Sequence, residues 1–449
     1  MSDELGWMHA LSYLGLSRNQ DVLGISGFGS LDEGSNRPWV LASSDLTPGL
    51  MTRLDSQRIV NVGPTFFREI GFRLGEVGVE FDALGRPVKP KFDSFVDSEL
   101  HWLREVIRAE SSATSFGWIE LDRWPSGHSF ACWLSHDLDA LSERNFFQVP
   151  RNWVQALVKS RSSDRSVYRR RAARATFRPL SVEAQFARLF SLVPPETSTF
   201  YVLVDRLLHR RGPRYRLTSS STKRVLAVIQ DRGGEFGFHV GTTYFRSRPL
   251  VSKSLKRLRD QVGPVQTTRG HYLCWDHRQS GEILSATGIT TDSTSGLPNG
   301  AGFRLGTSIP VRRENHPLEL PLVFMDVALW QEEDPHGRAE SLLAEIRRHG
   351  GLVSVLIHNE YVNAPEHEEM VQLMELIVGN CQQGGAWFAN AGSIHAWTEA
   401  KYVTRIERSG NEIKVINPPT NLGVKVWGRS PGPSGVVSEG EVEVMAGWI

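Results

Sequence analysis

The stretch Trp133-Leu134-Ser135-His136-Asp137-Leu138-Asp139 is the part of this sequence from which its fold is best inferred. An apolar run with β-favouring character, Phe130 to Leu134, ends there in a polar cluster that holds an imidazole and two carboxylates. Residues i and i+2 of an extended strand end point the same way, so we expect Asp137 and Asp139 to face one pocket. Two carboxylates with nearby histidines suit a metal ion and a general base. The alternative is a helix N-cap followed by a polar loop, because Asp is a favoured capping residue.

The composition is that of a globular protein with a large core. The 449 residues are 40% hydrophobic and 22% charged, and this length indicates two or three domains. A formal net charge of +1 argues against bulk nucleic acid as a partner. The arginine-rich run Tyr168 to Arg174 is therefore expected to be a solvated helix face rather than a phosphate or nucleic-acid site.

Cysteine usage and hydropathy bear on the compartment. Cys132, Cys274 and Cys381 lie far apart and form no CxxC motif, so we expect buried, reduced thiols. No apolar run approaches the roughly 20 residues that span a bilayer. The acidic start Ser2-Asp3-Glu4 lacks the order of a signal peptide. We therefore expect a protein with no membrane span, located in the cytoplasm.

The chain divides into three predicted regions. Residues 1–125 read as a mixed α/β accessory region, with helical spacing from Phe92 to Ile107. Residues 126–400 alternate strands and helices, which implies parallel strands joined by crossovers and favours a (β/α) barrel. Residues 401–449 read as a small all-β tail, either a packing element or a carbohydrate-binding appendix. The expected barrel strands after residue 195 are 199–204, 235–240, a strand just before His271, 289–291, 320–326, 352–358 and 385–389.

Polar residues recur at or just beyond the ends of these predicted strands. They are Asp137, Asp139, His239, Arg269, His271, Asp292, Asp326 and His358. In a parallel α/β barrel, catalytic groups collect at the carboxyl ends of the strands. Unrelated solvated residues would not be expected to recur at the ends of successive strands, so we predict a shared active site.

Over roughly residues 125–400 the sequence resembles the polysaccharide deacetylases, the NodB-homology group of metal-dependent carbohydrate esterases. Leu134-Ser135-His136-Asp137-Leu138-Asp139 is similar to the first motif of the family branch in which one apolar residue separates the two aspartates. The resemblance implies a distorted (β/α) barrel of the deacetylase type. It also implies that Asp137 is the general base and Asp139 a metal ligand.

Later segments resemble further motifs of that family. Glu235-Phe236-Gly237-Phe238-His239 is similar to the second motif, whose leading histidine binds metal. Arg269-Gly270-His271-Tyr272 is similar to the third, whose arginine lines the pocket and orients the base. Leu356-Ile357-His358 is similar to the last, whose histidine acts as general acid. Residues 292–307 and the closing residues 387–397 also resemble parts of the family domain.

One position departs from the family pattern. The second motif usually has another histidine four residues after the first, and here that position is Thr243. Threonine is a poor zinc ligand, so either another residue supplies the third ligand or metal binding is weakened. His271 is our candidate for the third ligand, because it follows an adjacent predicted strand.

The resemblance implies a hydrolase that removes an N-acetyl or other N-acyl group from an amino sugar or related carbohydrate. We expect a divalent ion, Zn²⁺, held by Asp139, His239 and His271, with one open position for water. Arg269 would keep Asp137 ionised.

His358 would then protonate the leaving amine. Asp326 would either orient His358 or another ligand, or cap a helix. Two alternatives stay open. The domain could bind a glycan without hydrolysing it, with Thr243 as the first sign of lost activity, or it could hydrolyse a non-sugar amide.

Overall fold

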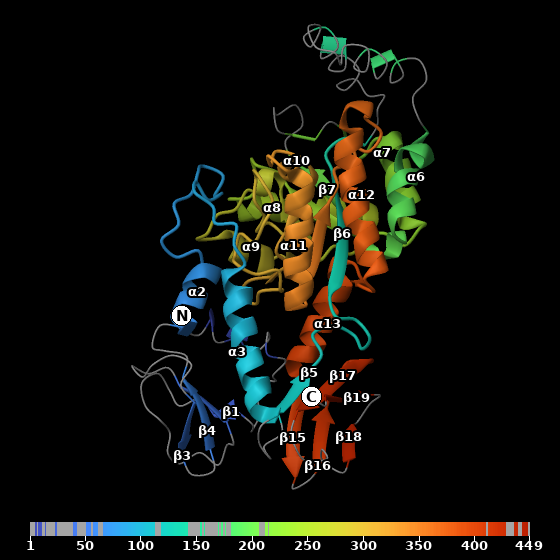
Figure 1. Ribbon diagram of the computed structural model, residues 1–449. Coiled ribbons are helices and arrows are strands. Elements are labelled where there is room, and N and C mark those ends of the chain that lie inside the picture. The colour runs from blue at the N-terminus through green and yellow to red at the C-terminus, as the bar shows by residue number, and fades with distance from the viewer. Residues whose placement is uncertain are drawn as a thin grey trace.

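The computed structural model of the chain describes residues 66–112, 118–141, 181–205, 215–409 and 412–427, together with shorter pieces elsewhere. Figure 1 shows a central body of strands and helices, two N-terminal helices along one side of it, and small strands below it. The mixed α/β class predicted from the sequence is confirmed. Most of the arginine-rich run at 168–174 lies outside the described residues.

A parallel sheet forms the centre of the body. Within the described residues, eight strands follow the order β11-β10-β9-β8-β7-β6-β13-β12, and β14 pairs with the first residues of β6. Every pairing in this sheet is parallel. The strands are β6 (Ala131–Leu138), β7 (Ser198–Val204), β8 (Glu235–Val240), β9 (Thr267–Gly270), β10 (Thr291–Asp292), β11 (Leu318–Glu319), β12 (Phe324–Met325), β13 (Leu352–Leu356) and β14 (Trp387–Phe388).

The two edges of this curled sheet are joined by one short segment. We predicted a single strand at 320–326, and the chain instead forms β11 on one edge and β12 on the other. Pro321 lies between them, and proline has no N–H to donate to a sheet ladder. Leu320 N donates to the Asp292 carbonyl at 2.8 Å, and Val323 N donates to Ser354 Oγ at 2.8 Å. The arrangement is compatible with a distorted (β/α) barrel.

Helices connect most strands and cover the outer face of the sheet (Figure 1). Four of them begin at a residue whose side chain accepts a backbone N–H. The capping residues are Ser181 of α6, Ser219 of α7, Asp334 of α11 and Asn390 of α13. The helices are α6 (Val182–Leu192), α7 (Ser220–Gln230), α8 (Arg248–Val262), α9 (Ser280–Ser285), α10 (Asp326–Leu329), α11 (Pro335–His349), α12 (Glu368–Gln383) and α13 (Ala391–Val403). Short 3₁₀ turns are η1 (Pro195–Thr197), η2 (His271–Leu273) and η3 (Pro365–His367).

The N-terminal helices are α2 (Phe66–Leu74) and α3 (Phe95–Ser112). Their apolar faces form a second buried cluster with Leu305, Ile309 and Val311 from the segment after β10. This packing fixes the two helices against the central body. A small sheet precedes them, with the order β1-β2-β4-β3 for β1 (Leu23–Gly24), β2 (Trp39–Ala42), β3 (Met51–Leu54) and β4 (Gln57–Asn61).

The C-terminal residues form two further three-stranded sheets. One contains β15 (Arg405–Ser409), β16 (Glu412–Ile416) and β18 (Gly435–Ser438). The other contains β17 (Leu422–Trp427), β19 (Val442–Gly447) and β5 (Trp118–Leu121). Because β5 comes before β6 in the chain and pairs antiparallel with β17, the C-terminal tail is tied to the start of the central body.

The cysteines and the lengths of the helices bear on two further predictions. The three cysteines are buried and free, as expected. Among the described helices, none is long and apolar enough to cross a bilayer.

Candidate metal centre

Strand β6 carries the two carboxylates of the candidate site. We expected the strand to end before the polar cluster, but it continues to Leu138, so Asp137 lies within it opposite Tyr201 of β7. Cys132, Leu134 and Leu138 lie in the core under the helices, while Asp137 and Asp139 share the opposite side with Arg269 and the histidines. Because successive side chains of a strand point to opposite faces, the residues that pack in the core are separated from those of the candidate site.

His239 is the next-to-last residue of β8, and one of its ring nitrogens is hydrogen-bonded to the backbone. Its Nδ1 lies 2.9 Å from the Arg269 carbonyl, and because a carbonyl only accepts, Nδ1–H is the donor. The lone pair of Nε2 is then directed at the carboxylates, 3.4 Å from Asp137 Oδ2 and 3.7 Å from Asp139 Oδ1. Burial lowers the pKa of this imidazole, so the neutral form that binds metals is present at neutral pH.

His271 reaches the same point from the end of β9. The chain turns sharply there, and both Tyr272 and Leu273 have positive φ, 58° and 56°. Such values are uncommon for non-glycine residues and occur at functional sites, where the surrounding structure holds them. The turn places His271 Nε2 at 3.4 Å from Asp139 Oδ2.

The three donors fit a divalent cation. Ligand atoms of Asp139, His239 and His271 all lie within 4.8 Å of one another. Two ligands on one tetrahedral metal, each at about 2.1 Å from it, are roughly 3.4 Å apart. Asp139 Oδ1 is buried and has no hydrogen-bond partner in the structure, which is the condition of an oxygen that a cation would satisfy. These side chains could therefore hold a metal ion.

Arg269 supports Asp137 from within the sheet. Its guanidinium is fully buried and donates to Asp137 Oδ1 at 2.8 Å and to Ser135 Oγ at 2.9 Å. The ring of Tyr201 lies beneath it, 4.4 Å from centroid to guanidinium carbon. Gly237 leaves room for that ring, because a Cβ at this position would lie 2.3 Å from a ring carbon.

The charges of the two aspartates are held in place by their neighbours. Burial alone would raise the pKa of Asp137, but His239 and Arg269 lower it below its ordinary value. Burial alone would also raise the pKa of Asp139, but His271 and His239 lower it below its ordinary value. Both carboxylates are therefore ionised at neutral pH.

His358 forms a pair with Asp326 on the neighbouring strands. Asp326 follows β12, and its Oδ1 accepts from His358 Nδ1 at 2.7 Å while Oδ2 accepts from His358 N at 2.8 Å. Burial would lower the pKa of the imidazole, but the carboxylate of Asp326, with those of Asp137 and Asp139, raises it to about 10. His358 is thus an imidazolium at neutral pH, with Nδ1–H tied to Asp326.

Two predicted positions lie elsewhere. Asp292 was grouped with the strand-end residues, but its carboxyl contacts Thr294 and Glu319, and burial followed by the charge of Glu319 raises its pKa. Thr243 donates from its hydroxyl and its N–H to Asp205, so it serves that carboxylate rather than a metal.

Some residues that contact the site, or that set the role of a position discussed above, were missed in the sequence. Asp205, which accepts from Thr243, directly follows β7, so the strand-end signal that selected the others could have selected it. Ser135 and Ser293, which contact the Arg269 guanidinium, carry no comparable signal, because serine is common in every environment.

Comparison with models of protein families and with curated proteins finds no match for this chain. The resemblance to polysaccharide deacetylases therefore rests on the motif residues alone.

Proposed function

We propose that this protein is a metal-dependent hydrolase that removes an N-acetyl or other N-acyl group from an amino sugar or related carbohydrate. The observation that supports it is the convergence of Asp139, His239 and His271 beside the Asp137–Arg269 pair. Metal ligands, a buried ionised carboxylate and a protonated histidine are groups that metal-dependent amide hydrolysis uses.

The metal would supply one kind of chemistry. When bound by Asp139, His239 and His271, a divalent ion such as Zn²⁺ lowers the pKa of water toward neutrality and polarises a carbonyl.

Asp137 is the general base of the proposed reaction. Its Oδ1 is occupied by Arg269, so Oδ2, which faces His239, accepts the proton of the attacking water. Because the Arg269 guanidinium holds the carboxylate ionised and orients it, the base needs no rearrangement before it acts.

His358 is the general acid. Asp326 binds Nδ1–H and leaves Nε2–H to protonate the amine as the C–N bond breaks. An amine is a poor leaving group until it is protonated, so the raised pKa of His358 keeps the required proton available.

The test combines metal analysis with turnover. Purified wild-type protein should contain a divalent metal and release acetate from N-acetylated amino sugars. The variants His239→Ala and His271→Ala should bind the metal more than about 100-fold more weakly, since even loss of a supporting group costs 10- to 100-fold. Thr243→Ala is the matched control, because its hydroxyl contacts Asp205, and it should keep the metal.

Other outcomes would contradict the proposal. Unchanged metal content in both histidine variants would show that His239 and His271 are not the metal ligands. Glycan binding that persists without metal and without acetate release would favour a non-catalytic binding protein. Turnover confined to N-acylated compounds without a sugar would keep the hydrolase and change its substrate.

A further inference from the structure

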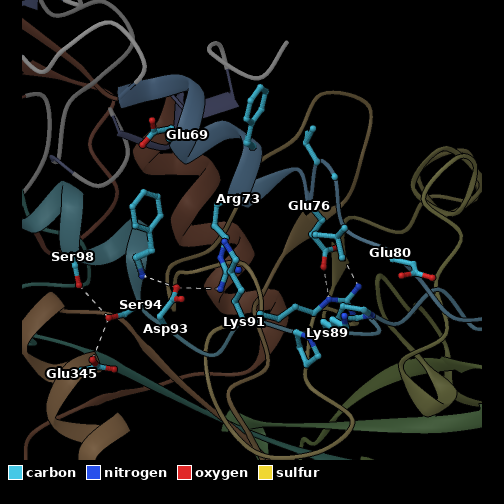
Figure 2. Close-up of a pocket in the computed structure, with 18 residues that line it drawn as sticks. Glu69, Arg73, Glu76, Glu80, Lys89, Lys91, Asp93, Ser94, Ser98 and Glu345 are labelled. Atoms are coloured by element: carbon cyan, nitrogen blue, oxygen red, sulfur yellow. Dashed lines mark hydrogen bonds and ion pairs between the residues drawn. The ribbon is translucent and has the colours of Figure 1, made fainter.

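A cavity lies outside the metal centre, where the N-terminal helices meet the central body. It has a volume of about 930 Å³, and its walls come from α2, the loop that follows it, the first turn of α3, Arg304 and Glu345 of α11 (Figure 2). None of its lining residues belongs to the metal centre. Small-molecule sites occupy about 300–1,000 Å³ and are common where two packed units meet.

Two lysines in this cavity have no counter-ion among the residues that the structure describes. They belong to the sequence Lys89-Pro90-Lys91, and both line the cavity. Within the described part of the chain, neither ammonium has an ion-pair partner or a side-chain hydrogen bond.

The two arginines of the cavity are already neutralised. Arg304 pairs with Glu76, Nε to Oε1 at 2.8 Å, and Arg73 contacts Asp93 Oδ1 at 3.2 Å (Figure 2). These pairs form the wall rather than a recognition site. The positive charge that remains open to a ligand is that of the two lysines.

Acceptors and an apolar surface complete the lining. The Glu80 carboxylate makes no side-chain contact with another described residue, and Glu345 accepts only a hydroxyl, from Ser94 at 3.3 Å. Carboxylates in such positions are acceptors for the hydroxyl groups of a polyol. Phe72 also lines the cavity and is 41% exposed, which offers a ring face to an apolar surface of a ligand.

Other classes of ligand fit less well. A purely cationic molecule would face Lys89 and Lys91, and a purely apolar one would bury charged groups without partners. A nucleic acid needs a series of basic contacts along its backbone, whereas this cavity offers two lysines without ion pairs among the described residues. A sugar that carries one anionic group fits this lining. Its anionic group would pair with the lysines, its hydroxyls would donate to the carboxylates, and its C–H face would pack on the ring of Phe72.

We propose that this cavity binds a monosaccharide that carries a phosphate or carboxylate group, at a site separate from the metal centre. The inference does not depend on the proposed hydrolysis, because it uses none of the residues of that site.

Isothermal titration of the full chain with glucose 6-phosphate, glucuronate and glucose tests it. At least one of the two anionic sugars should bind, and at least about tenfold more tightly than glucose, a difference of about 1.4 kcal/mol. The arm that binds more tightly identifies phosphate or carboxylate as the preferred charge.

Variants locate the site. Lys89→Glu with Lys91→Glu should weaken the anionic sugar at least about tenfold. The matched control Lys253→Glu replaces an exposed lysine of α8 and should leave the affinity unchanged. The variant His239→Ala should also bind normally, which separates this site from the metal centre.

Four results would overturn the inference. They are no heat from either anionic sugar, equal affinity for glucose, equal affinity for inorganic phosphate alone, and binding that survives the double lysine variant. Loss of binding in His239→Ala would assign the sugar to the metal centre and overturn it as well.

Discussion

The pair His358–Asp326 shows how one carboxylate can set both the orientation and the charge of an imidazole. Asp326 accepts from the ring Nδ1 and from the backbone N of the same histidine, so the ring cannot turn without losing a contact. The pKa of about 10 places the protonated form over the whole neutral range. The acid form is lost only as the pH rises through that value.

Replacement of Asp326 by Asn should therefore move the alkaline limb of the pH–activity profile. Without the carboxylate, the pKa of His358 falls toward the ordinary value of about 6.5, so the limb should shift down by roughly two to three pH units. The measurement is kcat against pH, supported by an NMR titration of the histidine.

Asp334→Asn is the matched control for this change. Asp334 caps α11 by accepting the Gly337 N–H, and Asn caps as well as Asp. Its profile should match that of the wild type. An alkaline limb that stays in place in Asp326→Asn would show that His358 is not the acid.

At the scale of one element, helix α11 depends on how it ends. Gly350 has φ 66° and closes the helix in the left-handed region, and a Cβ there would lie 2.9 Å from the Ser129 carbonyl oxygen. Gly350→Ala should lower the free energy of unfolding by about 1–3 kcal/mol. Urea denaturation measures it.

Gly379→Ala is the control for the Gly350→Ala variant. This glycine lies inside α12, and a Cβ there would meet nothing within 4 Å. The change should stabilise the protein by about 0.5–1 kcal/mol, because glycine weakens helix interiors. If both variants shifted stability in the same direction, the assigned backbone role of Gly350 would be wrong.

Strand β6 pairs with three other strands of the central sheet. It pairs with β13 along one side and with β14 and then β7 along the other. Leu134→Ala removes a fully buried side chain from its helix-facing side and should cost about 2–5 kcal/mol. Leu376→Ala, at a half-exposed position of α12, should change stability by less than about 0.5 kcal/mol.

For the whole molecule, a bound metal would add to folding stability. A ligand present at about 1,000 times its Kd stabilises the folded state by about 4 kcal/mol. A chelator should therefore lower the Tm of the wild-type protein and leave that of His239→Ala unchanged. Equal shifts in both proteins would mean that the chelator acts elsewhere.

Much of the molecule could be predicted from local pattern. The strand predicted at 235–240 is β8, residue for residue, because its apolar run lies between Gly234 and Gly241 and has a polar histidine near its end. The gathering of Asp139, His239 and His271 followed from one rule, that parallel strands present their carboxyl ends together. Neither required knowledge of distant contacts.

What could not be predicted depends on partners far away in the chain. The formation of two edge strands, β11 and β12, in place of the single strand predicted at 320–326 is set by their neighbours, Asp292 and Ser354. The role of Thr243 follows from Asp205, and the union of β5 with β17 joins residues about 300 positions apart. Sequence pattern carries no record of such pairings.

The short edges of the central sheet have a consequence for how copies of this protein meet. A neighbouring chain can extend a sheet only by pairing with an exposed edge. The edge strands β11 and β12 are two residues long, and Glu319 of β11 is already paired with Val311 through two backbone hydrogen bonds. The same stretch of polypeptide forms both rims and its proline interrupts the run between them. We therefore expect the parallel sheet to resist strand-by-strand growth into fibrils, even though its core is rich in β-branched residues.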